Sequence, residues 1–161
     1  MKLSRVQLRA FILAALTAIP LLSQERPSSA EPAKENAGLA SQKICSFIAV
    51  RDAKRAISFY RDTLGLRLVR EEPIALVFDA NGVMLRVQIV GNAVSIAPYT
   101  VLGWNVSDIV ATVTKLQKAG ITLMRVPGIK QDELGIWEAG DGTRIAWFKD
   151  PDGHTLSVAQ F

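Results

Sequence analysis

The chain repeats one order of predicted elements, and this repeat restricts its fold more than any other feature. An apolar strand at residues 44–50 precedes a helix capped by Asp52, and another at 100–106 precedes a helix capped by Ser107 and Asp108. Three further strands follow each helix, at 66–69, 74–79 and 83–90 in the first half and at 121–126, 143–149 and 154–159 in the second. A period of about 55 residues predicts two similar βαβββ modules, at about residues 44–98 and 99–161.

The segment before the repeat has the three parts of a secretory signal peptide. Residues 1–9 are basic, residues 10–22 form an apolar run too short to span a bilayer comfortably, and Ser28 and Ala30 are small residues at cleavage positions. We therefore predict a cleaved signal at 1–30, a flexible polar spacer at 31–43 and an exported, periplasmic or extracellular, domain. An uncleaved membrane anchor is the alternative, although Pro20 interrupts the apolar run.

Charge and cysteine content exclude several classes of function. The net charge of +4 falls to +1 without residues 1–30, so the remaining domain has no bulk charge that calls for nucleic acid or an anionic membrane. Cys45 is the only cysteine and cannot form an internal disulfide, so packing must stabilise the domain.

Several short motifs occur in a characteristic order along the two modules. The first module carries Val50-Arg51-Asp52 and then residues 56–65, AISFYRDTLG. The second carries Lys118-Ala119-Gly120 and, at residues 148–153, FKDPDG. In this order and spacing the chain resembles the vicinal oxygen chelate superfamily, which includes glyoxalase I, extradiol dioxygenases, and fosfomycin- and bleomycin-resistance proteins.

The resemblance implies an α+β fold. Two βαβββ modules would form a cupped, partly open mixed β-barrel with the helices outside, and members commonly form homodimers. In metal-dependent members, four side chains from the first and fourth strands of each module bind one divalent metal, which acts as a Lewis acid on substrate oxygens.

The resemblance assigns these four ligand positions to Cys45, Arg86, Val101 and Ser157 of this chain. None is a usual ligand of a divalent metal, and Arg86 has the wrong charge. We therefore predict no metal and no other cofactor. A different metal set of Glu138, His154 and Cys45 remains an alternative, although His154, the only histidine, is expected to point to the opposite face.

The residues expected to bind a ligand line this cup. The predicted binding residues are Cys45, Arg86, Gln88, Asn105, Trp137 and Ser157. The Arg86 guanidinium suits an anionic ligand, but it could instead face solvent or pair with an acid such as Asp79. Trp137 lies in a Gly-rich loop or short strand that could cover the cup mouth. No catalytic residue is identified.

Three classes of function remain open. The first is a metal-free binding protein for a small molecule, similar to bleomycin-resistance members. The second is an enzyme of the glyoxalase (lyase) or dioxygenase type, with a non-standard metal site. The third is an interaction module whose cup is filled by side chains.

Overall fold

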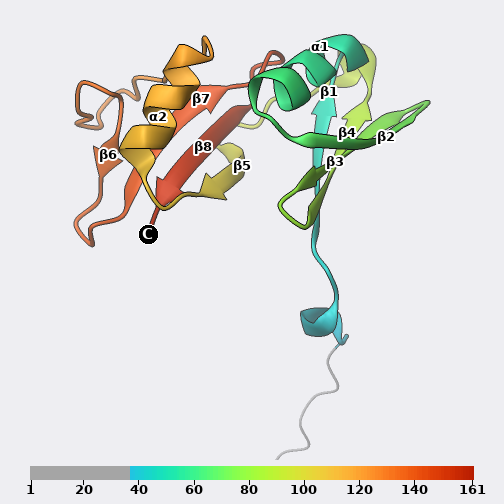
Figure 1. The fold of residues 1–161 in the computed structure, drawn as a ribbon, viewed down its shortest axis with the longest axis horizontal. Coiled ribbons are helices and arrows are strands. Elements are labelled where there is room, and N and C mark those ends of the chain that lie inside the picture. The colour runs from blue at the N-terminus through green and yellow to red at the C-terminus, as the bar shows by residue number, and fades with distance from the viewer. Residues whose placement is uncertain (1–36) are drawn as a thin grey trace, which may run out of the picture. The chain divides into compact units, whose positions relative to one another are not determined.

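The computed structural model describes residues 37–161 (Figure 1). The predicted signal peptide and residues 31–36 of the predicted spacer lie outside this range. Residues 37–44 are all exposed and contain one short 3₁₀ turn, η1 (Leu39–Ser41). Within the described range, no helix has the length and apolar character needed to cross a membrane.

The first module builds a mixed four-stranded sheet. Its elements are β1 (Cys45–Val50), α1 (Ala53–Ile57), η2 (Ser58–Thr63), β2 (Arg67–Glu72), β3 (Ala75–Ala80) and β4 (Val83–Ile89). The strand order is β1-β4-β3-β2, in which β1 runs parallel to β4 and the other pairs are antiparallel.

The second module repeats this topology after the short turn η3 (Gly91–Ala93). Its elements are β5 (Thr100–Asn105), α2 (Ile109–Lys118), β6 (Trp137–Glu138), β7 (Arg144–Lys149) and β8 (Thr155–Gln160), with the order β5-β8-β7-β6. The parallel pair is again formed by the first and last strands of the module. Two cupped mixed sheets that do not close into a barrel confirm the predicted fold class.

Both helices begin at the predicted caps. Asp52 accepts a hydrogen bond from the Arg55 amide at 2.8 Å, and Asp108 accepts one from the Ala111 amide at 2.9 Å. The first helix does not remain α-helical to its end, because residues of η2 form a π-helical turn. The Leu64 amide ends that turn by donating to the Phe59 carbonyl at 2.9 Å.

The strand predicted at residues 121–126 is wrong. This segment makes only an isolated bridge, between Leu123 and Phe148, and the edge of β7 pairs instead with β6. The Gln131 side chain supplies hydrogen bonds that a neighbouring strand would otherwise supply. Its Oε1 accepts from the Val126 amide at 2.7 Å, and its Nε2 donates to the Met124 carbonyl at 3.0 Å.

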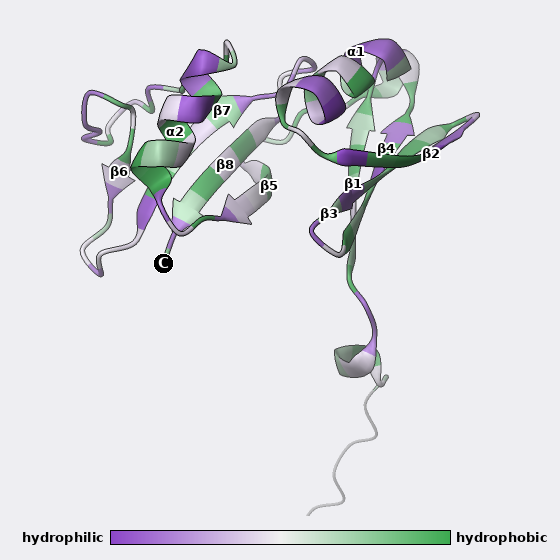
Figure 2. Cartoon of the chain, in the orientation of Figure 1, coloured by the Kyte–Doolittle hydropathy of each residue, from purple (hydrophilic) through white to green (hydrophobic). Residues whose placement is uncertain are grey.

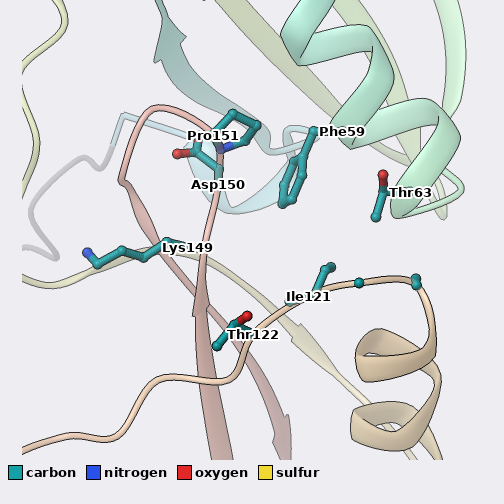
Figure 3. A pocket seen from close by; sticks show the side chains of 9 residues that line it. Phe59, Thr63, Ile121, Thr122, Lys149, Asp150 and Pro151 are labelled. Carbon is teal, nitrogen blue, oxygen red and sulfur yellow. The ribbon is translucent and has the colours of Figure 1, made fainter.

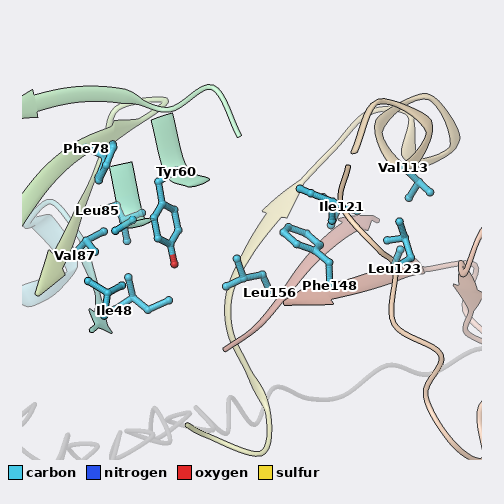
Figure 4. Packing of buried hydrophobic residues seen from close by; sticks show 14 of the residues in the cluster. Ile48, Tyr60, Phe78, Leu85, Val87, Val113, Ile121, Leu123, Phe148 and Leu156 are labelled. Atoms are coloured by element: carbon cyan, nitrogen blue, oxygen red, sulfur yellow. The ribbon is translucent and has the colours of Figure 1, made fainter. Parts of the chain in front are cut away.

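Alternation along the strands separates a core face from a concave face. On β4, Leu85 and Val87 are buried at 1% and 0% exposure, whereas Met84, the residue before Leu85, is 46% exposed. Figure 2 shows the same mixture of apolar and polar residues along both sheets. The buried face packs against the helices, and Figure 4 shows parts of this core, including Tyr60 and Phe78 in the first module and Val113 and Phe148 in the second.

Candidate functional site

The concave faces carry the residues that the sequence predicts as ligand contacts. In the first sheet, Cys45 lies beside Met84, Arg86 beside Phe47, and Gln88 beside Ala49 on paired strands. In the second sheet, Ser157 pairs with Gly103, and Asn105 pairs with Ala159. Each sheet therefore holds half of the predicted set. Burial alternates around Arg86 on β4, whereas β8 is buried from Leu156 to Ala159 and shows no such alternation around Ser157.

The four family metal positions do not provide a suitable donor set. Cys45 is exposed, and a register shift between Thr100 and Leu102 takes Val101 out of regular alternation, so that Val101 packs against the core. Within residues 37–161, no three His, Cys, Asp or Glu side chains lie close enough to hold a metal ion. A thiol, a hydroxyl, a guanidinium and an alkyl group do not fit a divalent cation.

Arg86 has a partner in its own sheet. Its Nη2 forms an ion pair with Glu72, and Glu72 also accepts from Arg70 at 2.8 Å. Hydrogen bonds from Arg86 first and Arg70 second lower the pKa of Glu72 below its usual value, so the carboxylate is charged at neutral pH. The suggested partner Asp79 is wrong, because that carboxylate pairs with Arg67 at 2.7 Å and caps the Gly82 amide.

The alternative metal set of Glu138, His154 and Cys45 does not come together. His154 is 4% exposed, and its Nε2 lies 2.8 Å from the Ala49 carbonyl oxygen, to which it must donate. Its Nδ1 is buried and has no hydrogen-bond partner. The Glu138 side chain is 68% exposed and pairs weakly with Arg144 at 3.8 Å.

The turn before β8 connects the two modules through buried carboxylates. The Tyr60 hydroxyl donates to Asp150 at 2.9 Å, and the Arg51 guanidinium donates to Asp152 at 3.1 Å. Burial first, and the negative charge of Asp150 second, raise the pKa of Tyr60 far above its usual value, so the phenol remains a donor. These bonds tie the turn to the end of β1 and to the first helix.

A hollow of about 370 Å³ lies beside this turn. Figure 3 shows Phe59 and Thr63 on one side of it and Ile121 on the other, with Asp150 and Pro151 above. The Asp150 carboxylate is already occupied by Tyr60 and by two backbone amides, the nearer at 2.8 Å. This hollow therefore lies between packed elements, and the Asp150 carboxylate is not available to a ligand there.

Two tryptophans lie together on the second sheet. Trp137 of β6 and Trp147 of β7 have ring centroids 6.1 Å apart and ring planes inclined by 30°. Trp137 lines a hollow of about 380 Å³ with Lys130, Arg144 and Glu138 among its walls. Trp147 borders a separate slot of about 320 Å³. The other residues of that slot are Pro98, Tyr99, Thr100, Met124, Val126 and Thr155.

The slot residues were not predicted as ligand contacts. Trp147 could have been found by alternation, because its neighbour Phe148 is fully buried and so places Trp147 on the opposite face. Tyr99 and Met124 lie outside regular strands, so no periodic signal in the sequence points to them. Cys45, Arg86 and Gln88 line neither this slot nor the hollow beside Trp137.

The fold resembles that of several solved structures. The glyoxalase family protein from Enterococcus faecalis has a TM-score of 0.60 at 20% identity, with 74% of this chain and 98% of that chain covered. Lactoylglutathione lyase from Agrobacterium tumefaciens has a TM-score of 0.57 at 18% identity, covering 74% and 93%. Oxidase ChaP-H2 has a TM-score of 0.58 at 27% identity, covering 74% and 93%.

Comparison with curated protein sequences found no significant match. The family model described as Glyoxalase/Bleomycin resistance protein/Dioxygenase superfamily matches residues 42–158, which include both modules. This range is well over half of the chain. The chain therefore belongs to the Glyoxalase/Bleomycin resistance protein/Dioxygenase superfamily.

Proposed function

We propose that this protein binds a small organic molecule on its concave surface without a divalent metal. The observation that carries the proposal is the Arg86–Glu72 ion pair at the position where the superfamily resemblance implies an acidic ligand. A guanidinium repels a cation, and Glu72, the one carboxylate bonded to it within residues 37–161, is already neutralised by two arginines. The charge at this position therefore opposes metal binding.

A second observation supports ligand binding on the same surface. Ser157 is 8% exposed on the concave face, and no hydrogen bond to its hydroxyl is found among the described residues. In that part of the chain the buried side-chain polar atom without a partner is His154 Nδ1, so the Ser157 hydroxyl keeps some access to solvent and can bond a ligand without breaking a bond within the protein. The neighbouring residue, Gly103, leaves room around this hydroxyl. A Cβ at that position would come within 2.7 Å of the Ser157 Oγ.

Metal titration tests the metal-free part of the proposal. Zinc, manganese and nickel ions, added separately to chelator-treated protein in a calorimeter, are expected to give no stoichiometric binding, because the donor set is unsuitable. The matched control is the double variant Cys45→Ala, Ser157→Ala, which removes the two weak donors at these positions. One ion bound per chain, with the binding lost in that variant, would contradict the proposal.

An enzyme with a non-standard site is the second candidate. Its support is the likeness to proteins described as an oxidase, at 27% identity, and as lactoylglutathione lyase, at 18% identity. We rank it second because the Arg86–Glu72 ion pair lies at one of the four ligand positions. A homodimer, which the superfamily resemblance implies, also remains an expectation.

We also propose that the protein is exported, on the strength of its first thirty residues. When the chain is expressed from Met1, the recovered protein is expected to begin at Glu31, as intact-mass measurement would show. The variant Ala30→Phe should block cleavage, because a bulky residue does not fit the cleavage position, whereas Ala37→Phe should have no effect. Recovery of the unaltered chain with Met1 still present, in the membrane fraction, would support the anchor alternative instead.

A further inference from the structure

Trp147 has an aromatic neighbour and also borders a cavity. Its ring centroid lies 6.1 Å from that of Trp137. It lines the slot of about 320 Å³ together with residues that include Met124 and Tyr99. Because the indole is only half-buried and borders this cavity, it is available for a ligand.

The chemistry of the slot selects a class of ligand. None of its lining side chains carries a charge at neutral pH, since they are Pro98, Tyr99, Thr100, Met124, Val126, Trp147 and Thr155. Charged ligands would lose their hydration there without gaining an opposite charge from these residues. The slot volume lies at the lower end of the range typical of small-molecule sites, about 300–1,000 Å³.

The aromatic and thioether side chains of the slot favour an aromatic ring as ligand. Tyr99, which precedes β5, is 67% exposed, so its ring is accessible to a ligand in the slot. Met124 lies at the edge of β7, where its amide donates to the Trp147 carbonyl at 2.7 Å. Aromatic and thioether groups attract the face and the edge of an aromatic ring.

We propose that this slot binds an uncharged planar aromatic group, stacked on Trp147 and contacted by Tyr99 and Met124. The hydroxyls of Thr100 and Thr155 are the polar side-chain groups available to a substituent of that ring. The inference rests on the proposed ligand-binding function and adds the class of ligand and the place where it binds. It does not depend on the absence of a metal from the four family positions.

The test compares two neutral probes with the same carbon skeleton. 2-Naphthol is flat and aromatic, whereas decahydro-2-naphthol is puckered and saturated. Each is titrated into protein labelled with ¹⁵N, and the three tryptophan indole signals are followed by NMR. 2-Naphthol is expected to shift the Trp147 signal saturably and to bind about tenfold more tightly than the saturated probe, because only the flat ring can stack.

Variants locate the binding. Trp147→Leu and Tyr99→Ser should each weaken 2-naphthol binding, by about tenfold for the tryptophan, and Tyr99→Ser should leave the fold intact because Tyr99 is 67% exposed. Phe47→Leu is the matched control, since Phe47 is also exposed on a concave face but lies in the other sheet. Equal binding of the two probes, no binding, or binding reduced only by Phe47→Leu would each overturn the proposal.

The outcomes separate this inference from the proposed function. If either probe bound and shifted signals around Arg86 and Phe47, the proposal of an aromatic slot would be contradicted. The proposal that the concave surface binds a ligand would still hold. If the protein bound a stoichiometric metal ion and 2-naphthol still stacked on Trp147, the metal-free proposal would be contradicted. The proposal of an aromatic slot would still hold. 2-Naphthoate, which has the same ring with a carboxylate, should bind Trp147 more weakly than 2-naphthol because the slot offers no positive charge.

Discussion

Replacing Asp150 with alanine is expected to lower the free energy of unfolding by about 3–5 kcal/mol, because several buried donors lose their acceptor. The Asp150 carboxylate is 5% exposed and accepts from the Tyr60 hydroxyl at 2.9 Å and from the amides of Asp152 and His154 at 3.0 and 2.8 Å. Tyr60 itself is fully buried, so its hydroxyl cannot turn to water. Urea denaturation followed by circular dichroism measures the loss.

Two other variants separate this effect from a general loss of charge. Tyr60→Phe removes one donor and keeps the turn bonds, so it should cost about 1–2 kcal/mol, clearly less than Asp150→Ala. Asp62→Ala removes an exposed aspartate whose ion-pair partner is the adjacent Arg61, and it should change stability little. If Asp150→Ala were no more destabilising than Tyr60→Phe, the buried carboxylate would not hold the turn as we describe.

Replacing Phe148 with alanine is expected to cost about 3–5 kcal/mol, as other large-to-small changes in well-packed cores do. Phe148 is fully buried on β7 and stacks with Trp104, with ring centroids 6.4 Å apart. Its removal would leave a cavity beneath α2 and withdraw support from Trp147, the next residue along the strand. Thermal and urea unfolding measure the change.

The controls for Phe148 vary size and exposure in turn. Phe148→Leu keeps much of the apolar volume and should cost less than half as much as the alanine change. Phe161→Ala removes the same ring from a site that is 82% exposed and should have almost no effect. A small loss for Phe148→Ala would mean that the second sheet tolerates a cavity and is packed less tightly than its burial indicates.

The concave and buried faces could be predicted from the sequence because strand alternation is a local property. Leu85 and Val87 point to the core, so Arg86 must point the other way, and the same argument places Ser157 between Leu156 and Val158. The helix starts were also predictable, since Asp52 and Asp108 bond amides only three residues away. Local spacing therefore predicted most of the strand order, while the role of the six residues in ligand binding stays a prediction.

The partner of Arg86 could not be predicted in this way. Asp79 lies on β3, next to the strand of Arg86, whereas Glu72 lies on β2, one strand farther away, and the choice between them depends on how these strands are paired. Asp79 pairs with Arg67 and caps a turn, which leaves Glu72 for Arg86. The acid that lies farther from Arg86 in the sequence is thus its partner, through contacts that are not local.

At residues 121–126, the sequence predicts a strand that the structure does not contain. Its apolar content is compatible with a strand, but Gln131 satisfies backbone groups of Met124 and Val126 that a strand ladder would use. A polar side chain can replace the hydrogen bonds of a strand ladder only when the fold brings it close to the backbone groups concerned. The hydrophobic periodicity of the sequence carries no information about this proximity. The segment therefore contributes Met124 to the slot beside Trp147 instead of a sheet edge.

By itself, the sequence determined the repeated strand and helix order apart from the segment at residues 121–126, the helix caps, and the face of most strand residues, Val101 excepted, because these depend on spacing within a few residues. The tertiary structure alone decided which acid neutralises Arg86, and that Tyr99, Met124 and Trp147 border one slot. These three residues come from separate segments, and only the packing of the second module brings them together. Ligand recognition depends on such long-range proximity, which is why the aromatic slot became visible only in the folded chain.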